Sequence, residues 1–538
     1  MTESNAGSNF AEAWESVADQ IPDAPAQRHD GAMWTWQEFD RRADAIAAFL
    51  LNRGVVEQDK VAQYLYNSPH YLESVFASFK AGLAVVNTNY RYTADELTYL
   101  WDNADVVAVV FHGAFVEQCQ AVRERLPSIS TWIWVDDGSG PRPEWATSYG
   151  EIIASWPGRT VAPWGRSSDH LLLCYTGGTT GMPKGVMWRQ EDLLNTLNVA
   201  SRKRRPPEDV ADSDVAIIDK PGPLNLPAAP LMHGTGMFNA MSALLNGGAI
   251  ITVPGRRFDP VELLDTIERE RVKSVTIVGD AFAKPILRAL DVEPHRWDIS
   301  SLRVMLSSGV MWSKETKDGL LRHNPRLIMV DALGSSEAIG MGSNTTTADG
   351  SGDSASFELS PSARVITEDD RDVAWGSGER GMVAMGGPMP LGYYKDDEKS
   401  AATFRVIDGV RYSIPGDFAT IDADGTVRFL GRGSQCINTG GEKVYPEEVE
   451  EALKLHPTVF DAAVVGVPDD KFGEAINALV EPAPGSAIDA GELIAHVKQR
   501  LAAYKAPKRI ISVESVNRAP NGKLDYKTLK RIALAADR

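Results

Sequence analysis

Cysteine is scarce in this sequence: 538 residues include three, Cys119, Cys174 and Cys436, and no two of them form a CxxC pair. This spacing gives no sign of a disulfide framework or a zinc site and is typical of a reducing compartment. No apolar run approaches the roughly 18 residues that span a bilayer. Residues 1–9 also lack the basic and apolar parts of a signal peptide. We therefore expect a cytoplasmic protein without an integral membrane segment.

A basic surplus is also lacking. The chain has 55 basic and 73 acidic residues and a net charge of −18, which argues against nucleic acid as a partner. No GxSxG or HExxH motif occurs, so the sequence lacks the catalytic motifs of the serine hydrolases and zinc proteases that use them. Gly376–Gly381 satisfies the GxGxxG pattern, but it leads into the apolar run Met382–Met385 rather than a helix, so a turn between strands is favoured.

The chain is too long for one core, so two or more domains are expected. Apolar segments such as 81–86 and 106–111 alternate with amphipathic stretches such as 36–52, which predicts an α/β fold with a mostly parallel sheet. Residues 363–431 have a β-like pattern. The tail after Gly431 predicts a small α+β domain.

The stretch Tyr175–Gly185 places four glycines, three threonines and Lys184 directly behind the apolar run Leu171–Cys174. A Gly/Thr-rich loop that leaves a buried strand presents backbone N–H groups and hydroxyls to an anion. Lys184 follows a proline and precedes a glycine, so the motif is not a Walker loop. The pattern indicates a nucleotide phosphate site rather than a flexible surface turn.

This loop resembles the phosphate-binding signature of the adenylate-forming superfamily, which includes acyl-CoA synthetases, carrier-loading adenylation domains and luciferases. It differs at Gly177, where the family usually has serine. The resemblance implies that Thr176 and Lys184 act in catalysis and that Thr176 helps to hold Mg²⁺. It also implies that the loop binds ATP and AMP through Thr176, Gly177, Gly178, Thr179, Thr180, Gly181 and Lys184.

A second block, Asp331–Glu337, follows the apolar run Leu327–Val330, and we expect it to form a loop at the end of a strand. It resembles the family's Tyr-Gly-x-Thr-Glu motif, with Leu333 in place of the tyrosine that stacks on adenine. The resemblance implies that Glu337 assists Mg²⁺ and catalysis. It also implies nucleotide contacts from Gly309, Asp331, Ala332, Leu333, Gly334, Ser335 and Ser336.

Asp417 and Arg432 resemble the family's Thr-Gly-Asp and Gly-Arg pair, which implies contacts to the ribose and phosphate of the nucleotide. Gly433 and Ser434 fall at the family's hinge. The family binds CoA close to the glycines that follow, which here are Gly440 and Gly441 with Glu442. Taken without the resemblance, Arg432 would be a surface ion pair and Gly440–Gly441 a plain turn.

Lys523, in Pro520-Asn-Gly-Lys523, lies on a tight turn near the end of the chain and would by default be a solvated lysine. In the family this position is the catalytic lysine, which also contacts ATP. All five blocks occur in family order along most of the chain.

The segment Pro227–Phe238 resembles the part of the family that lines the acid-binding tunnel, with His233 beside the carboxylate or packed as a core histidine. Glycine and soft apolar side chains there favour a long or bulky apolar acid. The sequence around Gly178, Trp188 and Cys436 is similar to that of actinobacterial fatty-acyl-CoA synthetases, including those that activate steroid side chains. The acyl-binding candidates are Met232, His233, Gly234, Met237, Phe238, Gly309 and Gly340.

We therefore predict an ATP-dependent, AMP-forming acyl-CoA synthetase that uses Mg²⁺ and CoA. The expected organisation is an AMP-binding domain over residues 1–431, a hinge at 432–434 and a small mobile C-terminal domain over 435–538. The large domain would combine layered sheets and helices with a β-barrel-like part. Two alternatives remain, an enzyme that loads the acid onto a carrier protein and a catalytically degenerate nucleotide-binding protein. The sequence also leaves open a homo-oligomer.

Overall fold

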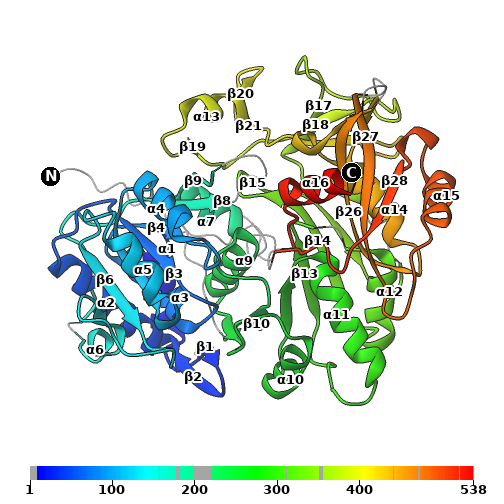
Figure 1. Ribbon diagram of the computed structural model, residues 1–538. Coiled ribbons are helices and arrows are strands. Elements are labelled where there is room, and N and C mark those ends of the chain that lie inside the picture. Colours follow the sequence, from blue (N-terminus) through cyan, green and yellow to red (C-terminus); the bar gives the residue numbers. More distant parts are fainter. Residues whose placement is uncertain are drawn as a thin grey trace.

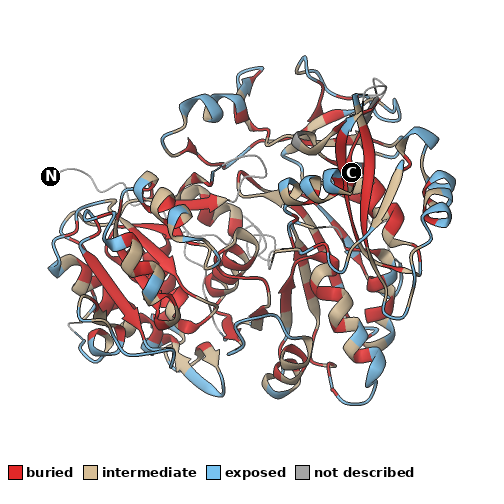
Figure 2. Cartoon of the chain, in the orientation of Figure 1, coloured by how far each residue is buried: buried red, intermediate tan, exposed pale blue. Residues whose placement is uncertain are grey.

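The computed structural model describes residues 9–156, 158–176, 182–198, 218, 220–310, 312–350, 355–439, 442–469, 473–519 and 522–536. Its strands form three sheets, and helices cover them (Figure 1). Buried residues concentrate in the strands and on the helix faces that pack against them (Figure 2). No helix among the described residues is both long and apolar enough to cross a bilayer.

The first sheet has eight strands, and all its pairs are parallel except those made by β9. Its order is β19 (Gly392–Tyr393), β9 (Lys184–Arg189), β8 (Leu171–Thr176), β4 (Ala84–Asn87), β3 (Lys60–Tyr64), β5 (Val106–His112), β6 (Thr131–Val135) and β7 (Thr147–Ser148). Because β8 is buried, Thr176 is delivered to the edge at the strand's carboxyl end, where open α/β sheets bind ligands.

The second sheet has fifteen strands. It is parallel from β1 to β14 along the sheet and antiparallel from β14 onward. Its order is β2 (Ala32–Thr35), β1 (Pro25–His29), β11 (Ala249–Thr252), β10 (Leu224–Pro227), β12 (Ser274–Ile277), β13 (Val304–Ser308), β14 (Ile328–Ser335), β15 (Ala338–Thr346), β16 (Ser356–Leu359), β23 (Val427–Arg432), β22 (Asp417–Ile421), β18 (Gly381–Met385), β21 (Val410–Ser413) and β20 (Phe404–Ile407), with β17 (Ala363–Ile366) beside β18.

The sequence predicted a β-barrel-like part in the large domain, and its β-like pattern covers residues 363–431. The strands that the structure describes there do not close into a barrel, because they continue the open second sheet through the pairing of β16 with β23. The α/β class and the smaller C-terminal part agree with the prediction.

The third sheet lies in the C-terminal part of the chain. Its order is β25 (Glu442–Val444), β24 (Ile437–Thr439), β27 (Gly473–Pro482) and β26 (Val459–Asp469), with β28 (Arg509–Ser512) parallel to β27. Helices α14 (Pro446–Lys454), α15 (Ala490–Arg500) and α16 (Tyr526–Ala535) accompany it.

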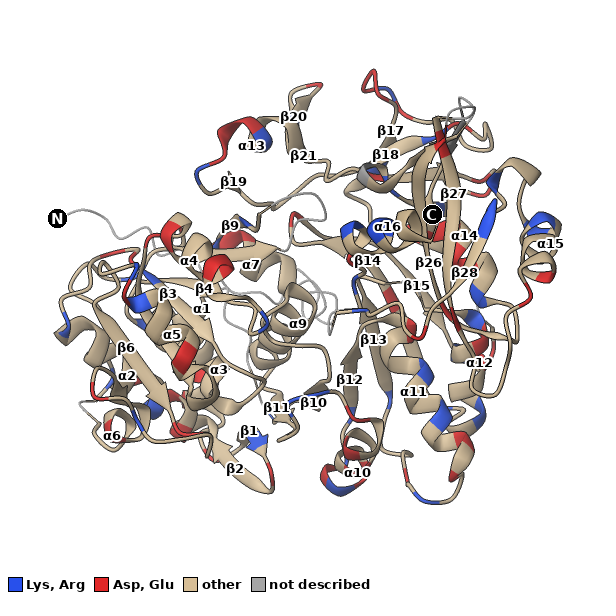
Figure 3. Ribbon diagram, viewed as in Figure 1, with Lys and Arg blue, Asp and Glu red and all other residues tan. Residues whose placement is uncertain are grey.

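The other helices belong to the larger part of the chain. They are α1 (Phe10–Gln20), α2 (Trp36–Asn52), α3 (Pro69–Lys80), α4 (Ala94–Asn103), α5 (Val116–Arg123), α6 (Tyr149–Ile153), α7 (Gln190–Leu197), α9 (Gly234–Leu245), α10 (Pro260–Glu270), α11 (Gly279–Val292), α12 (Lys314–His323) and α13 (Asp397–Thr403). Acidic and basic residues are interspersed over these helices and the connecting loops (Figure 3).

A buried lysine ties the first three helices together. The Lys80 side chain at the end of α3 is fully buried, and its ammonium lies 2.5 Å from Glu15, 2.7 Å from Asp40 and 2.7 Å from Asp44. Arg166 adds a second cation on Glu15, at 2.6 Å. These three carboxylates are close enough together to resemble a metal site, but they already surround an ammonium group.

Candidate functional site

The predicted catalytic lysine lies among the other predicted charged residues. The Lys523 side chain retains contact with solvent. Desolvation by the protein atoms around it lowers its pKa, and the positive charge of Arg432 lowers the pKa further. Glu337 and Asp417 oppose this shift with their negative charge. Burial, and then the positive charge of Lys523, lower the pKa of the His233 imidazole to about 3. Residues far apart in the sequence therefore converge on one place.

The turn that carries Lys523 docks onto the larger part of the chain. Gly522 has a φ of +72°, and a Cβ built there would lie 2.8 Å from Val310 Cγ2 and 2.9 Å from Val278 Cγ1. A side chain at this position would collide with both valines, so glycine permits the close approach. Asn521, which precedes it, lies outside the described residues.

Arg518 supports this turn and was not found from the sequence. Its guanidinium forms two hydrogen bonds with Asp461, at 2.6 and 2.9 Å. A third hydrogen bond, of 3.0 Å, goes to the main-chain oxygen of Gly522. Asp461 lies in β26, so the turn is attached to the C-terminal sheet. An arginine five positions before a lysine gives no sign of such a contact in the sequence alone.

Glu337 lies in the short turn between β14 and β15 and is buried. Its carboxylate accepts a 2.8 Å hydrogen bond from the Tyr393 hydroxyl, and its main-chain oxygen accepts one of 2.7 Å from the Ser413 hydroxyl. The indole N–H of Trp188 donates to the main-chain oxygen of Ser336 at 2.9 Å. The sequence gives no sign of these three hydrogen bonds, because the pattern of a buried strand does not reveal which distant acceptor one of its side chains contacts.

The expected loop over Asp331–Glu337 is wrong for most of its length. Residues through Ser335 belong to β14, because Asp331, Ala332 and Leu333 pair with β15 in an antiparallel hairpin. A Cβ at Gly334 would lie 3.0 Å from the main-chain oxygen of Ala338, which favours glycine at this bend. The side-chain hydroxyl of Ser335 is buried and has no hydrogen-bond partner among the described residues.

Two of these predicted nucleotide contacts point into the protein. The Asp331 carboxylate is buried 3.6 Å from Lys317, and burial raises its pKa to about 7 against the opposing charge of that lysine. Leu333 is buried in an apolar cluster that includes Met341, Phe357 and Val383. Their contacts with adenine remain a prediction.

Lys184 begins β9 directly opposite Thr176, the last residue of β8. Its ammonium forms an ion pair with Asp396 and lies 5.8 Å from the centre of the Tyr393 ring. The predicted phosphate-binding residues Gly177, Gly178, Thr179, Thr180 and Gly181 lie outside the described residues.

Asp417 and Arg432 are paired across neighbouring strands. They are register partners in β22 and β23, and Arg432 Nε lies 3.1 Å from the buried Asp417 carboxylate. The charge of Asp417 is the main cause that raises the pKa of Arg432. The contacts of this ion pair with ribose and phosphate remain a prediction.

The predicted hinge follows directly. The main-chain N–H of Gly433 donates to Gly416 at 3.0 Å, and a Cβ on Gly433 would lie 2.5 Å from the Phe418 ring. Packing against Phe418 therefore favours glycine here. Ser434 lies in the 3-10 turn Gly433–Gln435. Of the predicted CoA contacts, Glu442 begins β25, whereas Gly440 and Gly441 lie outside the described residues.

The acyl candidates gather at the start of α9. A Cβ on Gly234 would lie 3.1 Å from the Phe238 ring and 3.4 Å from the Ser336 hydroxyl. His233, which precedes α9, has a buried Nε2 without a hydrogen-bond partner among the described residues. Burial keeps the imidazole neutral near Lys523.

Other members of the set differ in the space around them. Gly340 has open space at its Cβ position, and at Gly309 the nearest atom is 3.9 Å away. Gly236, a glycine of the same segment outside this set, is closely packed: a Cβ there would lie 2.3 Å from the Pro230 main-chain oxygen. Met232 and Met237 are fully or almost fully buried within the main apolar core.

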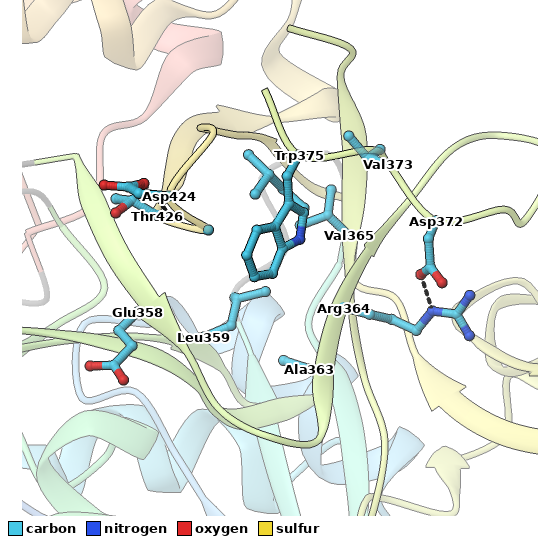
Figure 4. Close-up of a pocket in the computed structure, with 12 residues that line it drawn as sticks. Glu358, Leu359, Ala363, Arg364, Val365, Asp372, Val373, Trp375, Asp424 and Thr426 are labelled. Atoms are coloured by element: carbon cyan, nitrogen blue, oxygen red, sulfur yellow. Dashed lines mark hydrogen bonds and ion pairs between the residues drawn. The ribbon is translucent and has the colours of Figure 1, made fainter. Parts of the chain in front are cut away.

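A separate surface pocket of about 780 Å³ surrounds the exposed Trp375 (Figure 4). It is lined by residues of β16, β17 and the β22–β23 hairpin and includes none of the predicted site residues. Arg364 at its rim is paired with Asp372 at 2.6 Å. This pocket does not contribute to the predicted chemistry.

The fold and the convergent site define an adenylate-forming enzyme. The model of the AMP-binding enzyme family matches residues 14–394, and that of the AMP-binding enzyme C-terminal domain matches residues 448–523. The chain belongs to the AMP-binding enzyme family.

Its curated relatives include acid–CoA ligases of almost the same length. A medium/long-chain-fatty-acid–CoA/3-oxocholest-4-en-26-oate–CoA ligase from Mycolicibacterium smegmatis is 38% identical over 97% of this chain and 96% of its own. A 3-oxocholest-4-en-26-oate–CoA ligase from Rhodococcus rhodochrous is also 38% identical, over 97% and 95%. The medium-chain acyl-CoA ligase Mig from Mycobacterium avium is 36% identical over 97% of both chains.

Solved structures agree in fold. The anthranilate CoA ligase AuaEII with anthranoyl-AMP has a TM-score of 0.84 at 22% identity and covers 99% of this chain and 98% of its own. ATP-bound MatB from Rhodopseudomonas palustris has a TM-score of 0.81 at 26% identity, over 99% and 100%. The predicted family and the predicted enzyme class, an AMP-forming acyl-CoA synthetase with ATP and CoA as substrates, are confirmed.

Proposed function

We propose that this synthetase activates medium-chain, long-chain or bulky fused-ring carboxylic acids of the steroid side-chain type. The observation that carries the proposal is the open space at two of the predicted acyl-binding glycines. A Cβ at Gly340 would meet no atom within 4 Å and one at Gly309 none closer than 3.9 Å, and the Phe238 ring lies beside Gly234. The names of the relatives, which include fatty-acid and 3-oxocholest-4-en-26-oate ligases, support the same range.

The reaction would proceed in two steps. The acid carboxylate attacks the α-phosphorus of ATP, and pyrophosphate leaves with the bond electrons, giving acyl-AMP. The CoA thiolate then attacks the acyl carbon, and AMP leaves. In the first step Lys523 and Lys184 would stabilise the negative charge that develops on the phosphates. Asp417 and Arg432 would hold the ribose, so that positioning supplies much of the rate.

Mg²⁺ is part of the proposal. Glu337 and Thr176 offer carboxylate and hydroxyl oxygen, the hard donors that this ion prefers, and Glu337 is already oriented by Tyr393. Both residues would hold the ion against the phosphates, where it supplies charge neutralisation.

The proposed domains remain those predicted: residues 1–431, a hinge at 432–434, and 435–538. We propose a cytoplasmic location from the scarcity and wide spacing of cysteine in the sequence.

The test is pyrophosphate release across a panel of acids, from acetate through octanoate and palmitate to a steroid side-chain acid, each with and without CoA. We expect the highest kcat/KM with the larger acids and formation of the CoA thioester. Acetate or an amino acid as the best substrate would contradict the pocket assignment. Pyrophosphate release that leads to product only with a phosphopantetheinyl carrier protein would favour the carrier-loading alternative.

A further inference from the structure

One short turn contacts both charged groups that the proposed function assigns to the phosphates and the metal. Residues 393–396 begin at the last residue of β19, and the Tyr393 hydroxyl donates to the Glu337 carboxylate at 2.8 Å. Three residues later, Asp396 forms its ion pair with Lys184. The two contacts are therefore made by one turn.

The turn is firmly anchored. β19 pairs with β9, and the main-chain N–H of Tyr394 donates to the oxygen of Gly185 at 2.8 Å. On the outer side, the Tyr394 hydroxyl and the Lys395 ammonium bind the carboxylate of Asp105 at 2.7 and 2.8 Å. Movement of the turn would break several of these contacts together. Tyr393 and Asp396 are thus held in place by contacts that do not involve the site.

The environment of Tyr393 makes its hydroxyl a dedicated donor. The side chain is 5% exposed, and a phenol hydroxyl beside a carboxylate oxygen can only donate to it. A hydrogen bond to Oε1 leaves the other carboxylate oxygen of Glu337 available for another ligand. A carboxylate held in one orientation binds a small cation with strict geometry better than one that rotates.

Asp396 has a different effect on Lys184. Both side chains are partly exposed, 29% and 38%, so solvent and solutes can reach the pair. The charge and hydrogen bond of Lys184 lower the pKa of Asp396, which keeps the carboxylate ionised. An ATP phosphate oxygen would have to replace this carboxylate on the ammonium group.

We propose that Tyr393 and Asp396 are positioning residues for the adenylation step: Tyr393 fixes the Glu337 carboxylate for the metal, and Asp396 holds Lys184 until a phosphate displaces it. The proposal rests on the roles of Glu337 and Lys184 in the proposed function. Neither Tyr393 nor Asp396 belongs to the residues that the sequence marked.

The first experiment compares Tyr393→Phe with Tyr394→Phe. Both lose one phenolic hydroxyl from the same turn, but the hydroxyl of Tyr394 serves Asp105 on the far side. Mn²⁺ binding is titrated by electron paramagnetic resonance with ATP and without acid, so no turnover is needed. We expect about tenfold weaker Mn²⁺ binding for Tyr393→Phe, the scale of one hydrogen bond to a charged group, and little change for the control. Equal Mn²⁺ affinity in the two variants, both with native unfolding curves, would overturn this half.

The second experiment compares Asp396→Asn with Asp397→Asn. Each removes one negative charge from the same region, and asparagine at 396 keeps an oxygen to accept the α13 cap from the Lys399 main chain. Calorimetric titration with ATP alone should show severalfold tighter binding for Asp396→Asn, because no carboxylate competes for Lys184. Unchanged or weaker binding relative to Asp397→Asn would contradict the role of Asp396.

Two further variants separate this inference from the proposed function. Glu337→Gln and Lys184→Ala should each lower pyrophosphate release strongly. Full activity in both would remove the proposed site itself. Loss of activity in both, with Tyr393→Phe and Asp396→Asn behaving like their controls, would remove only the positioning role.

Discussion

Arg518 and Asp461 are joined by two hydrogen bonds, of 2.6 and 2.9 Å, and the same guanidinium holds the carbonyl of Gly522. Both side chains are mostly buried, at 13% and 16% exposure, so solvent screens the pair less than it would at the surface. The residue next to Gly522 is the predicted catalytic lysine. The precision with which Lys523 enters the site therefore depends on an ion pair in the C-terminal sheet.

The first prediction concerns this ion pair. Arg518→Gln should lower the rate of acyl-adenylate formation by about tenfold or more, because a small misplacement of a reacting group is costly. Thiolysis of supplied acyl-AMP should change less. Stopped-flow pyrophosphate release measures the first step, and Lys530→Gln, which breaks the Lys530–Glu474 ion pair, is the control. Similar losses in the two variants would assign Arg518 a general structural role.

The second prediction concerns Lys523 itself. Lys523→Ala should slow adenylate formation by roughly 10²–10³, the scale for loss of one preorganised charge donor. Desolvation by the surrounding protein and the charge of Arg432 lower the pKa of Lys523. The rate of adenylation by the native enzyme should therefore decrease as the pH rises, with a midpoint below the ordinary lysine pKa of about 10.4. The variant should lack this alkaline limb. An equal loss in both half-reactions would argue against a role confined to adenylation.

The third prediction uses Glu447, whose carboxyl packs against Gly431 beside the hinge. Burial, and then the charge of Glu450, raise its pKa to about 8 from an ordinary 4.5. A raised pKa means that the folded state gains stability from the bound proton at low pH, and that this gain is lost as the pH rises through about 8.

Glu447→Gln should therefore unfold at a higher temperature than the native protein at pH 9, with a smaller difference at pH 5. Calorimetric or fluorescence melting curves at both pH values provide the measurement. Glu514→Gln, at an exposed position, serves as the control. Parallel pH profiles of the native protein and Glu447→Gln would show that this carboxyl is not protonated in the folded state.

The fourth prediction tests the acyl pocket. Gly309 and Gly340 have φ of +92° and +74°, so any side chain there would strain the backbone and confuse the result. Gly234 is the better position, because its added atoms would point toward Phe238 and Ser336. Gly234→Leu should reduce kcat/KM for octanoate and larger acids by about tenfold for each two methylenes excluded, and spare butyrate. A uniform loss over all chain lengths would place Gly234 outside the pocket.

Local features of the fold could be predicted because their causes are local. The helix expected over 36–52 is α2, and it begins where Thr35 and Glu38 form a capping box. The sequence Asp-Ala-Asp-Gly at 422–425 is typical of a hairpin turn, and it joins β22 and β23, with Gly425 at a φ of +88°. In each case the residues that decide the structure are close neighbours in the sequence.

Long-range contacts could not be predicted in this way. β14 runs through Ser335 because β15 pairs with it, although Gly334 and Ser335 suggested a loop. Gly236 is a packing glycine because Pro230 approaches it, which its own sequence context does not reveal. Tyr393 reaches Glu337 across 56 positions. The candidate charged residues were found through their motifs, while the groups that orient them became apparent only in the fold.

The fully buried Lys80 sets a limit on how the chain can be shortened. Glu15, one of its three counter-ions, comes from α1, the first described helix. A chain that begins after Gln20 would lose Glu15 and also leave Arg166 without its partner. It would also lose Trp14, whose ring lies 5.2 Å from that of Phe76, and so uncover the aromatic residues against which Trp14 packs. Because α1 is part of the main apolar core, a chain made for protein production should keep it. Affinity tags or fusion partners are then best attached ahead of Asn9.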